Sequence, residues 1–263
     1  FCAPCSIYAG DYCDAVDSDI VIITSGIARK PGQTRLELAQ TNVNITKMII
    51  PEITRYAPQA TYIIVSNPVD ILTYVFHKCS NIPENRIIGS GTILDTARLR
   101  ARLSEYYNIS QSNVHAYVFG EHGDSSFVPW SVANISNIPI GECDHLIKTS
   151  DLVAPTLNFA EVEQYVKKSG GRVIARKGAT YYAVSVSVCH ICKCLLSGID
   201  TTMTVSTMMH GEYGIDDVCL STLNLVGHDG VRVKVHVPLT DGETEKLRNS
   251  ARTLKEVICQ LNL

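Results

Sequence analysis

Two short apolar runs and the stretch between them set the pattern of the first part of the chain. The runs at 19–24 (DIVIIT) and 61–66 (TYIIVS) are rich in β-branched residues and end in polar ones, which is typical of buried parallel strands. Between them, residues 35–57 repeat apolar side chains at helical spacing. They predict a helix that Pro51 kinks or ends, because proline donates no amide hydrogen and collides with the preceding turn.

The alternation of strands and helices continues beyond this unit. The segment NPVDILTYVFHKC indicates a second helix with Pro68 at its first position, followed by a short strand at RIIG and a helix through DTARLRARLSEYY. Strands that alternate with helices in this way predict an α/β fold with a doubly wound parallel sheet.

The pattern changes after about residue 90. We expect strands at NVHAYVFG and VRVKVHVPL, and helical segments near 151–169 and 243–262. Residues 180–197 alternate like a strand at AVSVSV, but their length and their Ala and Leu ends favour a helix. This part of the chain therefore predicts a second domain of mixed α+β type.

A glycine-rich phosphate-binding turn is missing from the beginning of the chain. Doubly wound domains that bind dinucleotides normally open with a strand, a G-x-G-x-x-G turn and a helix, and an acidic residue ends the next strand. Nothing before residue 19 supplies these features, and GSGTIL at 89–94 has only two of the three glycines. We therefore expect the chain to start inside the domain, without about two strand-helix units of ~30 residues each.

The composition fits a globular protein with one large domain or two ordinary ones: 263 residues, 45% apolar and 19% charged. A formal net charge of −3, with scattered basic residues, argues against nucleic acid or an anionic membrane as a partner. No apolar stretch approaches the ~20 residues of a membrane span, and the first residues lack a signal-peptide layout. We therefore expect a cytoplasmic protein.

Ten cysteines are spread along the chain, with two local clusters at CAPC and CHICKC. Neither cluster has the second ligand pair of a zinc site or the strand-helix context of a redox motif. Cys189 and Cys192 fall on one helical face, where cysteine acts as a small apolar residue. We expect no metal site and mostly reduced, buried cysteines.

The loop GEHGDSSFVPW carries His122 directly after an expected strand. Histidine is the side chain best suited to exchanging protons near neutral pH, although an ordinary polar turn would have the same spelling. In TILDTARLR, Asp95 and Arg98 are helical neighbours. Asp95 could hold one nitrogen of His122 and favour its charged form, while Arg98 could bind a carboxylate. Alternatively, Thr92 and Asp95 form a capping box, with Arg98 as a local ion partner.

Polar residues also follow the first two expected strands. Asn67 either caps the helix that follows it or offers its amide to a ligand at the carboxyl end of its strand. Thr24 and Gly26 lie at the same end of the first strand, and the Gly- and Pro-rich segment beyond them could act as a lid. Its basic side chains, among them Arg29 and Arg35, would swing in on closure or remain solvated.

Four segments, NPVDILTYV, GSGTILDTARLR, GEHGDSSFVPW and KGATYY, occur in the order found in the L-lactate/malate dehydrogenase family. The chain resembles this family over essentially its whole length, and most of all its bacterial L-lactate dehydrogenases. The resemblance implies a partial NAD-binding Rossmann domain over 1–89 and a substrate domain over 90–263. It further implies reversible, NADH-dependent reduction of pyruvate to L-lactate.

By this resemblance His122 is the acid/base, Asp95 orients it, and Arg98 binds the C1 carboxylate of the substrate. Arg35 would polarise the carbonyl group. Asn67 and Thr180 would also contact the substrate. The NAD-binding positions implied by the resemblance are Tyr12, Thr24, Gly26, Ile27, Val65 and Asn67.

Arg29 departs from the lactate-type pattern. In lactate enzymes of this family that lid position is typically glutamine, and in malate enzymes an arginine there pairs with the second carboxylate of the substrate. An unpaired arginine buried beside a methyl group would be unfavourable. Glu121, Trp130 and Thr180, however, belong to lactate-type spellings. We favour lactate, with NAD-dependent malate dehydrogenase as the alternative and a non-catalytic fragment without a competent cofactor site as a third possibility.

Arg100 and His115 raise a regulatory hypothesis. In bacterial lactate dehydrogenases similar to this chain, the matching residues lie at a subunit interface and bind the phosphates of fructose 1,6-bisphosphate. The resemblance therefore implies a homotetramer with this activator as a partner, unless both side chains are ordinary surface or interface residues.

Overall fold

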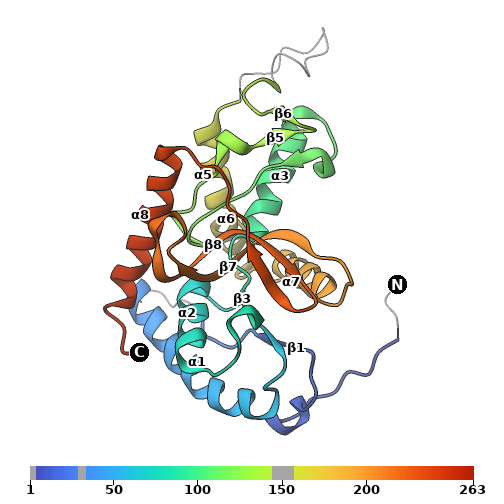
Figure 1. Ribbon diagram of the computed structural model, residues 1–263, viewed down its shortest axis with the longest axis vertical. Coiled ribbons are helices and arrows are strands. Elements are labelled where there is room, and N and C mark those ends of the chain that lie inside the picture. Colours follow the sequence, from blue (N-terminus) through green and yellow to red (C-terminus); the bar gives the residue numbers. More distant parts are fainter. Residues whose placement is uncertain (1–3, 29–33, 144–156) are drawn as a thin grey trace.

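A six-stranded mixed sheet in the order β1-β2-β3-β7-β8-β9 runs through the computed structural model of the protein (Figure 1). The structure describes residues 4–28, 34–143 and 157–263, without the side chain of Arg35. The parallel strands are β1 (Ile20–Ile23), β2 (Thr61–Ile64) and β3 (Ile87–Gly89). The antiparallel strands are β7 (Thr201–His210), β8 (Asp216–Gly227) and β9 (Gly230–Lys234).

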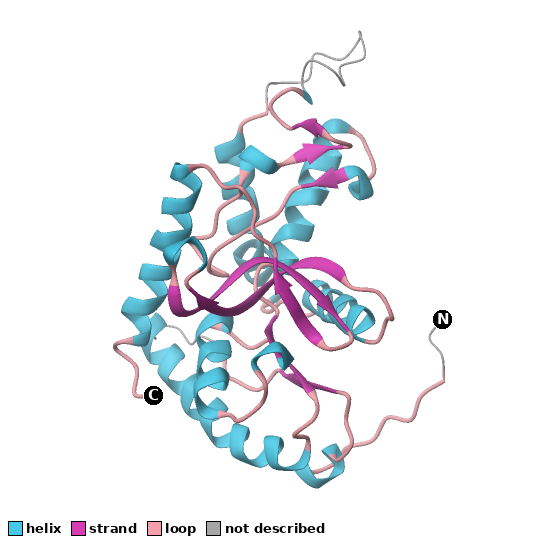
Figure 2. Cartoon of the chain, viewed as in Figure 1, coloured by secondary structure: helices cyan, strands magenta, loops and turns pink. Residues whose placement is uncertain are grey.

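Helices cover both faces of the parallel strands (Figure 2). Tyr62 and Ile64 of β2 pack into one core, together with residues of α1 (Arg35–Tyr56), α2 (Val69–Cys79) and α8 (Asp241–Ile258). Ile63 points to the opposite face and packs with α3 (Ile93–Tyr107) and α7 (Tyr182–Leu195). This burial on both faces explains why β2 is apolar at nearly every position. The α/β fold with helices on both sides of the sheet agrees with the sequence prediction.

A smaller three-stranded sheet, β4-β5-β6, lies at the top of Figure 1. Its strands are β4 (Val114–His115), β5 (Asn134–Ile135) and β6 (Ile138–Pro139). They share a second apolar core with α3 and α5 (Phe159–Lys167), and α6 (Ser169–Lys177) follows directly. The short 3-10 turns are η1 (Tyr12–Ala15), η2 (Glu84–Arg86), η3 (Gln111–Asn113), η4 (Trp130–Val132) and η5 (Glu212–Gly214).

Gly89 lies where the parallel and antiparallel halves of the large sheet meet. It pairs with Ser206 of β7, and a Cβ atom at residue 89 would come 2.3 Å from Oγ1 of Thr73 and 2.8 Å from Cβ of Ser206. Because real Cβ contacts are not that short, the close packing of α2, β3 and β7 requires glycine here. This junction brings β7 next to the amino end of α2.

Several elements differ from the sequence prediction. The helix expected over 35–57 is confirmed as α1. Of the two effects expected of Pro51, an end of the helix was wrong, since α1 continues to Tyr56 with Pro51 exposed and with Ile50 and Ile53 buried on its inner side. The strand expected over NVHAYVFG is limited to β4 and two isolated bridges, between Phe119 and Phe127 and between Gly120 and Ser221.

The strands β7 and β8 and the helix α6 were not predicted. Strand β7 is buried, but its threonines and serines make it look polar in the sequence. In the folded protein their hydroxyl groups form hydrogen bonds with other buried residues. For example, Thr204 bonds to Thr96. The helix expected over 180–197 is confirmed as α7. The division of the chain at 89/90 falls at the end of β3, where the sheet continues into β7, and stays a prediction.

The expectation that most cysteines are buried was wrong for the nine that the structure describes, all of which are free thiols. Three are buried (Cys143, Cys194 and Cys219), whereas five are exposed (Cys5, Cys13, Cys79, Cys189 and Cys259). On α7, Ile191 and Leu195 fill the core, so the face that carries Cys189 is turned to solvent. Within the described ranges, no helix is long and apolar enough to cross a membrane.

Candidate active site

The loop that carries His122 is anchored at its beginning to two distant elements. Gly120 pairs with Ser221 of β8, and the backbone N–H of Glu121 donates to Oγ of Ser250 in α8 at 2.7 Å. Gly120 has a φ of +93°, and a Cβ atom there would come 2.7 Å from Oγ of Ser250. Glycine is therefore needed to direct His122 back towards α3.

His122 faces a carboxylate and, beyond it, a guanidinium group. Its Nδ1 lies 2.6 Å from Oδ2 of Asp95, and Nη1 of Arg98 donates to Oδ1 of the same carboxylate at 3.0 Å. The capping box expected at Thr92 was wrong, because Oγ1 of Thr92 donates to the carbonyl of Val118 and does not cap α3. Asp95 is thereby free of a capping role and holds both His122 and Arg98.

The pair of Asp95 and His122 is electrostatically coupled. Burial opposes the charge on each group, but their mutual attraction and hydrogen bond outweigh it. The pKa of Asp95 is therefore lowered, with a smaller contribution from Arg98, and the pKa of His122 is raised. The arrangement favours the protonated imidazole, which can donate a proton to a bound molecule and afterwards take up another.

Asp70, which was not expected as a site residue from the sequence, reaches His122 from α2. Its Oδ2 accepts a hydrogen bond from the backbone N–H of His122 at 2.7 Å, and its Oδ1 accepts one from Oγ of Ser206 at 2.5 Å. A lone carboxylate in the apolar helix VDILTYVF was the available signal, because a buried acid requires partners.

The loops after β1 and β2 are tied together by Asn42 of α1. Its Oδ1 accepts from the backbone N–H of Ile27 at 2.8 Å, and its Nδ2 donates to the carbonyl of Asn67 at 2.7 Å. Oγ of Ser66 donates to the carbonyl of Ser25, whereas Oγ of Ser25 is buried without a hydrogen-bond partner. This edge of the sheet is thus rigidly built and keeps one polar group unsatisfied.

The expected cofactor positions lie mainly along this edge. Thr24, Gly26 and Ile27 follow β1, and Val65 follows β2. Tyr12 is in η1, which precedes the amino end of β1 and packs on α1.

The remaining predicted substrate positions are only partly described. Asn67 does not cap α2, since the cap position is Pro68 and no side chain bonds there, so the capping alternative was wrong. Thr180 lies exposed between α6 and α7. Arg29 lies outside the described residues, and Arg35 begins α1 with its side chain outside them.

Arg100 and His115 lie against the same stretch of chain. Nε of Arg100 donates to the carbonyl of Ala116 at 3.1 Å, and its guanidinium carbon lies 4.8 Å from the ring centroid of Tyr117. His115 is exposed in β4.

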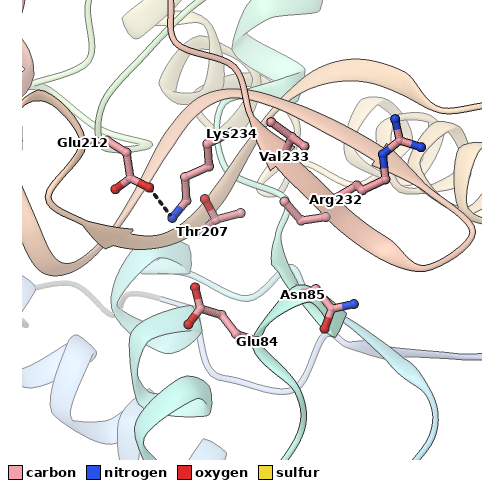
Figure 3. A pocket seen from close by; sticks show the side chains of 8 residues that line it. Glu84, Asn85, Thr207, Glu212, Arg232, Val233 and Lys234 are labelled. Carbon is pink, nitrogen blue, oxygen red and sulfur yellow. Dashed lines mark hydrogen bonds and ion pairs between the residues drawn. The ribbon is translucent and has the colours of Figure 1, made fainter.

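Two pockets open on the surface, one away from the predicted site residues and one that includes Arg98. The first, of about 510 Å³, lies between η2 and β9 and is lined by Glu84, Thr207, Glu212 and Lys234, with Lys234 paired to Glu212 at 3.0 Å (Figure 3). It contains none of the predicted site residues. The second, of about 320 Å³, lies between α3 and α5–α6 and includes Arg98 with three further arginines, Arg102, Arg172 and Arg176. Within the described part of the chain, no cluster of three or more His, Cys, Asp or Glu could hold a metal ion.

Comparison with known protein families matches both parts of the chain. Residues 1–89 match the model of the lactate/malate dehydrogenase NAD binding domain, and residues 92–262 match that of the lactate/malate dehydrogenase alpha/beta C-terminal domain.

Curated proteins and solved structures give similar matches. The chain is 45% identical to an L-lactate dehydrogenase of Thermoanaerobacterium saccharolyticum over 99% of this chain and 83% of that protein. It is 46% identical to L-lactate dehydrogenase 1 of Clostridium acetobutylicum over 97% and 81%. The fold superposes on the minor L-lactate dehydrogenase of Enterococcus mundtii with a TM-score of 0.91 at 33% identity, covering 98% of this chain and 81% of that one.

Proposed function

Because the chain belongs to the lactate/malate dehydrogenase family, we propose that it is an NAD-dependent L-lactate dehydrogenase that reversibly reduces pyruvate to L-lactate. The observation that carries this proposal is the contact between Nδ1 of His122 and Asp95, with Arg98 on the same carboxylate. The names of relatives about 45% identical over almost the whole chain support the same activity.

The residues along the carboxyl edge of β1 and β2 fit a bound dinucleotide. Open α/β sheets bind such ligands at this edge, and the buried, unpartnered Oγ of Ser25 is a polar group that a ligand could satisfy. NADH, when bound, supplies the hydride. Thr24, Gly26, Ile27, Val65 and Asn67 would hold it from these two loops, and Tyr12 is a further candidate by sequence resemblance.

His122 serves as the proton donor to the carbonyl oxygen of pyruvate. Since Asp95 holds Nδ1, the proton leaves from Nε2, and in the reverse direction Nε2 takes up the hydroxyl proton of lactate. Asp95 keeps the ring in one orientation and stabilises its charged form. The guanidinium of Arg98 binds the carboxylate that every 2-oxo acid carries.

Three further side chains complete the proposed substrate site. Arg35 polarises the carbonyl group as negative charge develops on its oxygen, a kind of contribution that can reach several kcal/mol. Asn67 hydrogen-bonds the same oxygen, and Thr180 lies near the substrate's side chain. These three assignments rest on the resemblance of the sequence to the family.

The substrate preference is tested by comparing kcat/KM for pyruvate and oxaloacetate. We expect pyruvate to be preferred, and Arg29→Gln to increase that preference, because glutamine removes a charge that only a second carboxylate would neutralise. The neighbouring Lys30→Gln variant is the matched control and should leave the ratio unchanged. A kcat/KM for oxaloacetate well above that for pyruvate would contradict the lactate assignment and favour malate.

We further propose a cytoplasmic homotetramer that fructose 1,6-bisphosphate activates through Arg100 and His115. Two cationic groups near each other at an interface would repel one another until an anion arrives. The bisphosphate should lower the KM for pyruvate and promote tetramer assembly in sedimentation experiments. If it changes neither quantity, the regulatory proposal is wrong, and the catalytic one is unaffected.

A further inference from the structure

A groove between α3 and α6 gathers four arginine side chains around one cavity. Arg98 and Arg102 line it from α3, and Arg172 and Arg176 line it from α6. In each helix the two arginines are four residues apart, so they lie one above the other on the same face. The cavity of about 320 Å³ therefore has guanidinium groups on two of its walls.

Carboxylates neutralise only part of the positive charge of this groove. Among the described residues that line it, Glu105 is the one acidic side chain, and it pairs with Arg102 at 3.3 Å at the exposed rim. In the described ranges, neither Arg172 nor Arg176 forms an ion pair with a carboxylate. Like charges that face one cavity repel one another, so the groove favours an anion that enters it.

Arg172 is held in place by uncharged groups. Its Nη2 donates to the carbonyl of Tyr165 at 2.8 Å and to Oγ of Ser169 at 2.9 Å, and its guanidinium carbon lies 4.0 Å from the centroid of the Tyr165 ring. The guanidinium carbon of Arg102 lies 5.0 Å from the same centroid. Contacts of a cation with an aromatic ring orient the arginine without cancelling its charge. The groove is therefore arranged for an anion before the anion binds.

The size of the cavity and the geometry of arginine indicate the class of anion. The cavity is at the lower end of the range of small-molecule sites, about 300–1,000 Å³. The planar guanidinium group binds phosphate and carboxylate oxygens through paired hydrogen bonds. A carboxylate offers two oxygens in one plane, whereas a phosphoryl group offers three oxygens in different directions, which suits donors on two walls. The formal net charge of −3 for the whole chain argues against a long polyanion as the ligand.

This groove is separate from the proposed site for fructose 1,6-bisphosphate. Nε of Arg100 donates to the carbonyl of Ala116, and its guanidinium group packs on Tyr117. None of these three residues lines the groove. Arg98, in contrast, belongs both to the groove and to the proposed substrate site, and its Nη1 already donates to Asp95. The groove therefore meets the proposed substrate site at one guanidinium group.

We propose that this groove binds a small anion with two or three phosphoryl groups, and that the bound anion weakens the binding of the substrate carboxylate at Arg98. Two anions beside one guanidinium group repel each other, so each lowers the affinity for the other. The second part of the inference rests on the proposed function, whereas the first part does not.

Isothermal titration calorimetry with inorganic triphosphate tests the binding. The titrations use saturating NADH and the Arg100→Gln background, so that the proposed cofactor and activator sites do not take up the probe. The double variant Arg172→Gln/Arg176→Gln changes two exposed side chains and should raise the Kd for triphosphate roughly tenfold or more, because it removes charge-assisted hydrogen bonds. Arg252→Gln is the matched control, since Arg252 is an exposed arginine that pairs with Glu245, and its Kd should equal that of the background protein.

Two results of the calorimetry would overturn the inference. An unchanged Kd in the double variant would show that triphosphate does not bind in the groove. Equally tight binding of citrate, a small anion that carries three carboxylates, would show that the groove does not select phosphoryl groups.

Steady-state kinetics at saturating NADH test the effect on Arg98. Triphosphate should raise the KM for pyruvate roughly fivefold or more, and the double variant should lose this effect. If triphosphate binds in the groove but leaves the KM unchanged, the second part of the inference is wrong. If the protein does not reduce pyruvate at all, the proposed function fails, and the calorimetry still decides whether the groove binds the anion.

Discussion

At the scale of single residues, the site depends on one carboxylate that has two partners. Asp95 accepts from Arg98 through one oxygen and contacts His122 through the other, and its side chain is 10% exposed. In such a dry position a carboxylate polarises its partners more than it would in water. The cluster was expected from the spacing of Asp95 and Arg98 and from the loop of His122, because short-range helical geometry and the end of a strand are both readable in sequence.

The substitution Asp95→Asn should lower kcat/KM for pyruvate by roughly 10²-fold or more, since a neutral amide no longer favours the imidazolium or its correct orientation. The loss should be greatest at alkaline pH, because the raised pKa of His122 depends mainly on Asp95. Steady-state kinetics between pH 5 and 9 check this. Asp229 is an exposed carboxylate in the β8–β9 turn, and the control variant Asp229→Asn should match the native protein. If Asp95→Asn also matched the native protein, the contact between Asp95 and His122 would have no part in proton transfer.

At the scale of elements, the fit between α2, β3 and β7 positions the site. Gly89, Thr73 and Ser206 touch at this junction, and Ser206 also donates to Asp70. A side chain added here has to displace the helix that carries Asp70 or the strand that carries Ser206. The geometry of the His122 loop is therefore sensitive to packing at a residue that touches no substrate.

We expect Gly89→Ala to lower the free energy of unfolding by about 1–3 kcal/mol through overpacking. The same substitution should reduce kcat, because it disturbs the geometry of the His122 loop. Urea unfolding followed by fluorescence or circular dichroism measures the first effect. Gly242→Ala is the matched control, because a Cβ at that helical position meets nothing within 4 Å and alanine is the better helix former. Equal stability of the two variants would contradict the packing argument.

At the scale of the whole molecule, the alternating half of the fold could be predicted, whereas in the antiparallel half only β9 was expected, within VRVKVHVPL. The strands β1 to β3 can be recognised in the sequence from their runs of β-branched residues, and α7 from its length. Strand β7 places Thr204 and Ser206 at buried positions, where their hydroxyls bond to Thr96 and Asp70, 108 and 136 residues away. Asp70 was missed for the same reason, since its partners are 52 and 136 residues away.

His77 makes the whole molecule sensitive to acid. Burial lowers the pKa of His77 to about 4, and its Nε2 is buried without a hydrogen-bond partner. Between these two pKa values, His77 is protonated in the unfolded chain but not in the folded protein. The free energy of unfolding therefore falls as the pH drops from 6.5, the ordinary pKa of histidine, towards about 4.

Between pH 7 and pH 4.5, the free energy of unfolding of His77→Gln should fall by roughly 2 kcal/mol less than that of the native protein, because glutamine does not titrate. Urea unfolding at several pH values measures this difference. His228→Gln, an exposed histidine in the β8–β9 turn, should follow the native curve. Parallel curves for His77→Gln and the native protein would contradict the assignment.

The anchoring of the His122 loop has a consequence for the order in which the protein becomes active. A nascent chain that has just passed residue 122 already contains the imidazole, both aspartates and the guanidinium. The hydroxyls of Ser206 and Ser250, which lock Asp70 and the loop, arrive only with β7 and the last helix. Recovery of turnover during refolding should therefore report completion of the carboxyl-terminal third and lag behind the recovery of helical signal.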